Sequence, residues 1–68
     1  MREKLEQLVA EMVDKGIRFE DAHREFEKRF IARVVQQSDG NLSRAAQTLG
    51  VHRNTLTRKM KELRIRTR

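Results

Sequence analysis

The sequence lacks cysteine, proline, tryptophan and tyrosine, and each absence narrows what the protein can be. Without cysteine there is no disulfide and no thiolate metal site. The two histidines, His23 and His52, lie far apart with no further His or Cys beside them, which argues against a structural zinc site. A chain of 68 residues buries little surface by itself, so a partner subunit is the remaining means of stabilising it.

The sequence also lacks an apolar run of about 18 residues that would cross a membrane. Its charged start, Arg2-Glu3-Lys4, is unlike a signal peptide, so we expect a cytoplasmic protein without membrane contact. Acidic and basic residues of the first 40 positions are interleaved at helical spacing, which is typical of surface ion pairs. No combination of nucleophile, base and metal ligands is apparent, and we expect neither an enzyme nor a cofactor.

Charge is divided unevenly along the chain. Residues 1–40 contain eight basic and nine acidic residues, whereas residues 41–68 contain eight basic residues and only Glu62 as an acid. A near-neutral part joined to a strongly basic part is typical of a nucleic-acid binder. A solvated basic helix without a partner would have the same composition, and charge alone leaves that alternative open.

Residues 1–40 are predicted to form two amphipathic helices. The first, about 2–15, ends before Gly16 and has apolar residues at helical spacing, namely Leu5, Leu8, Val9, Met12 and Val13. The second, about 19–37, ends before Gly40 and contains all three phenylalanines, which we interpret as core residues. Both apolar stripes are too broad to be hidden within one chain. A helical hairpin that pairs with its copy would cover them, and the residues expected at that homodimer interface are Leu8, Met12, Phe26, Phe30 and Val34.

Residues 41–68 have the pattern of a helix-turn-helix followed by a basic tail. Asn41 is a strong N-cap for a helix of about 42–49, whose apolar face includes the small pair Ala45 and Ala46. Gly50 then supplies a tight turn before a second helix of about 53–63, with inward residues Leu56, Met60 and Leu63. A plain helical hairpin would share this pattern. The outer face of the second helix favours DNA recognition, because Arg, Asn and Thr side chains can contact base edges in the major groove. Arg53 is the strongest candidate for such a contact.

Two runs of this sequence resemble the Fis-type DNA-binding domain. They are Asn41-Leu42-Ser43-Arg44-Ala45-Ala46 and Leu49-Gly50-Val51-His52-Arg53-Asn54-Thr55-Leu56-Thr57-Arg58-Lys59-Met60-Lys61-Glu62-Leu63. Within that family, the C-terminal domain of NtrC-type regulators is most similar. The resemblance implies an all-α fold of four helices per subunit, an intertwined homodimer through the first two, and binding to an imperfect palindrome in double-stranded DNA. The residues expected at the DNA are Asn41, Ser43, Arg44, His52, Arg53, Asn54, Thr55, Arg58 and Lys59. For His52, a solvent-exposed cap is an equal alternative.

NtrC-type regulators have receiver and ATPase domains upstream, and Fis has an N-terminal β-hairpin arm. This sequence starts at Met1 with neither, so we expect a free-standing protein or an excised domain, in which case an upstream regulatory domain is a possible partner. The predicted function is a DNA-binding transcriptional regulator of bacterial, nucleoid-associated type. Two alternatives stay open: an architectural protein that bends DNA with low sequence specificity, and a dimeric protein-interaction module with a basic docking face.

Overall fold

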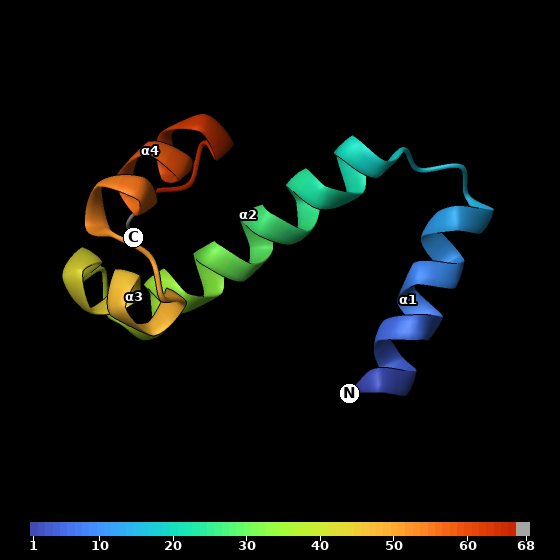
Figure 1. The fold of residues 1–68 in the computed structure, drawn as a ribbon, viewed down its shortest axis with the longest axis horizontal. Coiled ribbons are helices and arrows are strands. Elements are labelled where there is room, and N and C mark those ends of the chain that lie inside the picture. Colours follow the sequence, from blue (N-terminus) through green and yellow to red (C-terminus); the bar gives the residue numbers. More distant parts are fainter. Residues whose placement is uncertain (67–68) are drawn as a thin grey trace.

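The computed structural model describes residues 1–66, and this part of the chain is all-helical (Figure 1). The four helices are α1 (Arg2–Asp14), α2 (Phe19–Gln37), α3 (Leu42–Leu49) and α4 (Arg53–Leu63). These are the four helices per chain that the sequence predicted. The end of the predicted basic tail, residues 67 and 68, lies outside the described residues.

Each helix ends in a turn closed by backbone hydrogen bonds across a residue with positive φ. At the end of α3, the Val51 N–H donates to the Ala46 carbonyl over 3.0 Å, and Gly50 between them has φ +75°. The corresponding positive-φ residues at the ends of α1, α2 and α4 are Gly16, Asp39 and Arg64. Such turns satisfy carbonyls that the helix end leaves without partners. The chain can therefore change direction sharply at each junction.

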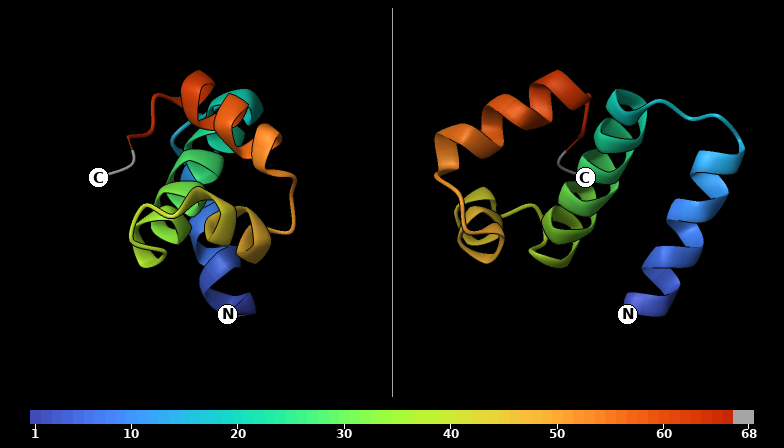
Figure 2. Two further views of the ribbon diagram at one scale, coloured as in Figure 1. Left: turned by 90° about the vertical axis from the view of Figure 1, so that its left-hand side faces the viewer. Right: turned by 45° about the vertical axis from the view of Figure 1, so that its right-hand side comes forward.

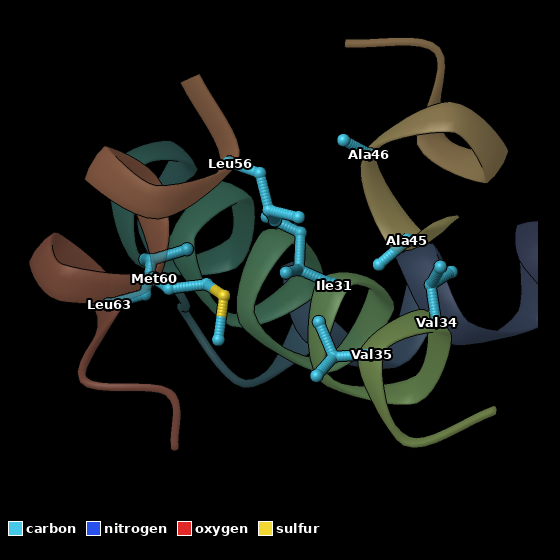
Figure 3. Close-up of a cluster of buried hydrophobic side chains, with 8 residues drawn as sticks. All are labelled: Ile31, Val34, Val35, Ala45, Ala46, Leu56, Met60 and Leu63. Atoms are coloured by element: carbon cyan, nitrogen blue, oxygen red, sulfur yellow. The ribbon is translucent and has the colours of Figure 1, made fainter. Parts of the chain in front are cut away.

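A single hydrophobic core joins the second half of α2 to α3 and α4 (Figure 3). Its buried members are Ile31, Val34, Val35, Ala45, Ala46, Leu56, Met60 and Leu63. Leu56 and Ala45 are both 0 % exposed, and the small Ala45 side chain permits close approach of α3 to its neighbours. We name this compact unit, from Ile31 to the end of α4, the head.

The head includes the C-terminal half of α2, a helix that the sequence assigned to dimerisation. Val34, predicted at the dimer interface, is only 9 % exposed and belongs to the core of its own chain. That assignment is corrected for a physical reason. Two helices as short as α3 and α4 cannot enclose a core between them, so they require the C-terminal half of α2 as a third wall.

Helix α1 stands apart from the head and has no buried residue. Figures 1 and 2 show it on the opposite side of α2 from α3 and α4. The predicted hairpin of α1 and α2 therefore does not close into a packed pair within one subunit. The radius of gyration, 13.4 Å, exceeds the roughly 11 Å expected of a compact chain of this length. Among residues 1–66, no helix combines the length and apolar character needed to span a membrane.

Candidate nucleic-acid interface

Helix α4 has two opposite faces of different chemistry. Its buried residues, Leu56, Met60 and Leu63, follow spacings of four and three. Because successive residues are 100° apart, positions 54, 58 and 61 lie on the opposite side of the helix. The exposed side chains of α4 are Arg53, Asn54, Thr57, Arg58, Lys61 and Glu62. The helix therefore anchors itself to the head by one face and presents cations and hydrogen-bonding groups on the other.

His52 caps the start of α4. Its Nδ1 accepts a hydrogen bond from the Asn54 N–H over 3.0 Å, and the side chain is otherwise exposed. In a neutral imidazole whose Nδ1 is an acceptor, the proton is on Nε2. The structure thus places His52 in the cap role that the sequence left open, and Nε2 has no part in the cap. A DNA contact by that group stays a prediction.

The start of α3 offers a second group of exposed polar residues. Asn41 Oδ1 accepts from the Arg44 N–H over 3.1 Å, which confirms the predicted N-cap. Asn41, Ser43 and Arg44 are all exposed. The N-terminus of a helix carries partial positive charge and unpaired N–H groups, both of which favour an anion.

Three residues of α4, Thr55, Thr57 and Arg58, differ in burial and in the contacts that their side chains make within the protein. Thr55 is half-buried, and the Thr57 hydroxyl donates to the Arg53 carbonyl over 3.1 Å, so Thr57 is bonded within its own helix. Arg58 lies 3.6 Å from the Glu62 carboxylate, with both side chains about 60 % exposed. An exposed ion pair of this length is weak, and Arg58 can exchange that carboxylate for another anion.

Lys59 is placed differently from its neighbours. Its ammonium donates to the Glu27 carboxylate of α2, and the two side chains are 31 % and 24 % exposed. The hydrogen bond from Lys59 holds the pKa of Glu27 below its ordinary value, against the opposing effect of burial. We predicted Lys59 at the DNA, whereas here its charge is turned toward α2.

Sequence reasoning missed Glu27, which we had included among surface ion pairs. Its partner is 32 positions away, and no local spacing rule connects two residues so distant. One signal was available. Glu27 precedes the buried Ile31 by four positions, which places the carboxylate on the side of α2 that faces the head.

The residues predicted to pair two subunits are largely exposed. Leu8, Phe26 and Phe30 are each more than half exposed, and Met12 is half-buried. Other exposed apolar residues of α1, α2 and their connection are Leu5, Val9, Val13, Ile17 and Phe19. These residues and the four predicted ones form what we call the apolar set. Exposed apolar residues that gather into a large contiguous patch mark an interaction site.

Comparison with known proteins gives a consistent picture. The model of the family described as "Bacterial regulatory protein, Fis family" matches residues 22–63, which include most of α2 and all of α3 and α4. A curated relative, the "Putative Fis-like DNA-binding protein" of Xylella fastidiosa, is 49% identical over 39 residues. That alignment covers 57% of this chain and 43% of the relative, so the chain matches less than half of the relative's length. No solved structure matches the chain significantly. The family match extends over more than half of the sequence, and the chain belongs to the Fis family of bacterial regulatory proteins.

Proposed function

We propose that this protein is a transcriptional regulator that binds a palindromic site in double-stranded DNA as a homodimer. The observation that carries the proposal is the division of α4 into a buried apolar face and an opposite, exposed face with Asn54, Arg58 and Lys61. Arg53 adds a further exposed cation in the first turn. The curated relative is named as a DNA-binding protein, which supports the same function. In this arrangement α4 enters the major groove, which is about 12 Å wide and admits one helix.

The first turn of α4 is the part that would read base edges. In helix-turn-helix proteins, the N-terminal residues of the recognition helix make most base contacts. Arg53 is exposed at that position, and a guanidinium can bond guanine O6 and N7 together. Asn54 and Thr55 follow it. The exposed start of α3, with Asn41, Ser43 and Arg44, would hold a phosphate of the backbone and fix the register.

A homodimer follows from the apolar set. A single head offers one short recognition helix, which spans few base pairs. Pairing two copies through Leu8, Met12, Phe26 and Phe30 would cover exposed apolar surface and present two recognition helices together. Val34 has no part in this interface, because the core of its own subunit already covers it.

Selection of preferred sites from random duplex DNA tests this function directly. We expect enriched sites with two inverted half-sites. The Arg53→Ala variant should lose about 1–3 kcal/mol at the selected site, together with the preference at one base pair of each half-site. Arg33→Ala, which removes an exposed arginine from α2, is the matched control and should keep that preference.

Each result distinguishes between functions. Sites enriched only for flexible steps, without base preferences, would indicate an architectural DNA-bending protein. Equal loss of affinity for selected and random DNA in Arg53→Ala would exclude direct base reading by Arg53. Absence of any DNA binding would overturn the proposed function and favour an interaction module with a protein partner.

A further inference from the structure

The contact between Glu27 and Lys59 joins the helix that carries the exposed phenylalanines to the candidate recognition helix. Lys59 and Glu27 line, with Phe26, Phe30 and Leu56, a mostly apolar hollow between α2, the end of α3 and α4. The methylene stem of Lys59 therefore lies along apolar surface while its ammonium reaches the carboxylate. Both side chains are more than two-thirds buried, which limits the screening of their attraction by water.

This contact holds the Lys59 ammonium against α2, whereas the other cations of α4 are exposed to solvent. Arg53, Arg58 and Lys61 are exposed, whereas Lys59 is half-buried. Lys59 is on the flank of α4, 100° around the helix from Arg58. A helix in the major groove has phosphates on either side, so a flank residue is placed to reach the DNA backbone once its ammonium is released.

We propose that Glu27 is a positioning residue that sets the strength of DNA binding, because it holds Lys59 on α2 and keeps that cation away from the DNA phosphates. The proposal rests on the DNA-binding function proposed above. A cation on the phosphates strengthens binding to every sequence alike. Glu27 thus lowers the affinity of the protein for DNA of any sequence and makes that affinity less dependent on salt. It acts through Lys59 and touches no base.

The salt dependence of DNA affinity separates this role from a merely structural one. The slope of log affinity against log salt changes by about −0.9 for each phosphate that a cation neutralises. Affinities of the full chain for a selected site and for a random duplex would be measured over a range of salt concentrations. The variants are Glu27→Gln, Lys59→Met, the double variant, and Glu25→Gln as a matched control. Glu25 is exposed on α2 and pairs with Arg29 of the same helix, so its loss removes one negative charge without freeing Lys59.

We expect Glu27→Gln to steepen the slope by about 0.9 per subunit and to strengthen binding to the random duplex and to the selected site by similar factors. Lys59→Met, which keeps most of the apolar stem, should leave the slope of the wild type unchanged. The double variant should return to the wild-type slope, because the freed cation is gone. Glu25→Gln should not change the slope.

Two results would overturn the proposal. An unchanged slope in Glu27→Gln, with helical content retained, would show that the Glu27 carboxylate does not keep Lys59 away from the DNA phosphates. A shallower slope in Lys59→Met alone would show that Lys59 already contacts phosphate in the wild type. This second measurement can overturn the proposal even if Glu27→Gln fails to fold. Failure of the wild type to bind DNA would instead overturn the proposed function, so the two failures are distinct.

Discussion

Phe26 and Phe30 lie one turn apart on α2, with ring centroids 5.3 Å apart and ring planes tilted by 45°, and both rings are more than half exposed. The next residue, Ile31, is buried in the head at 6 % exposure. The apolar residues of α2 therefore form two groups that differ in burial. One group builds the core of the chain, and the other is exposed to solvent.

Phe30→Asp should separate the homodimer and weaken DNA binding in the same step, because a carboxylate would have to enter an apolar interface. Light scattering gives the mass, and titration with the selected site gives the affinity. Lys28→Asp places a carboxylate on the opposite side of α2, two positions from both phenylalanines, and should leave the dimer intact. A Phe30→Asp protein that remains dimeric would remove this ring from the proposed interface.

His52 variants can separate its cap role from a DNA contact. His52→Ala removes the acceptor of the Asn54 N–H and should lower the free energy of unfolding by about 1 kcal/mol. His52→Asn retains a good N-cap and should be nearly as stable as the wild type. Urea denaturation measures both. A wild-type stability in His52→Ala would contradict the cap, and lower DNA affinity in a stable His52→Asn would indicate that the imidazole contacts DNA.

Gly50 holds the turn between α3 and α4 at φ +75°, and a Cβ added there would meet no atom within 4 Å. The cost of Gly50→Ala therefore comes from the left-handed backbone alone, and we expect a loss of about 1–2 kcal/mol. Thermal unfolding should show it as a lower Tm. Gly50→Asn is the matched control, since Asn adopts this conformation more readily than Ala. Equal losses in the two variants would point to a cause other than φ.

The stability that Glu27 contributes should depend on pH. Its pKa lies below the ordinary value of 4.5, chiefly because of the hydrogen bond from Lys59, with a smaller influence of His23. A depressed folded-state pKa means that the contribution is complete above about pH 4.5 and is lost as the pH falls through the folded-state pKa.

Wild type and Glu27→Gln should accordingly differ by about 1 kcal/mol at neutral pH and converge in acid. Urea denaturation at several pH values between 7 and 3 measures the difference. Glu25→Gln should show a smaller effect throughout, since the Glu25–Arg29 pair is more exposed. A difference that stays constant across this range would contradict a role for the ionised Glu27 carboxylate.

Local sequence determined the helices and their ends. The apolar spacing of Leu56, Met60 and Leu63, the Asn41 cap and the Gly50 turn all depend on residues within a few positions of one another. Such interactions are decided by backbone geometry, and the sequence alone was sufficient to predict them. The same is true of the charge division between residues 1–40 and 41–68, which composition fixes.

What covers each apolar face, and where each charge points, was decided only by the tertiary structure. Helical periodicity placed Val34 on an apolar stripe of α2. It did not predict that α3 and α4 would enclose this residue. It placed Lys59 on α4 but not beside Glu27, which comes from another helix. The physical reason is that helical spacing fixes the direction of a side chain relative to its own axis. The crossing of distant helices then decides whether a side chain that points in that direction enters the core, contacts another helix or stays exposed.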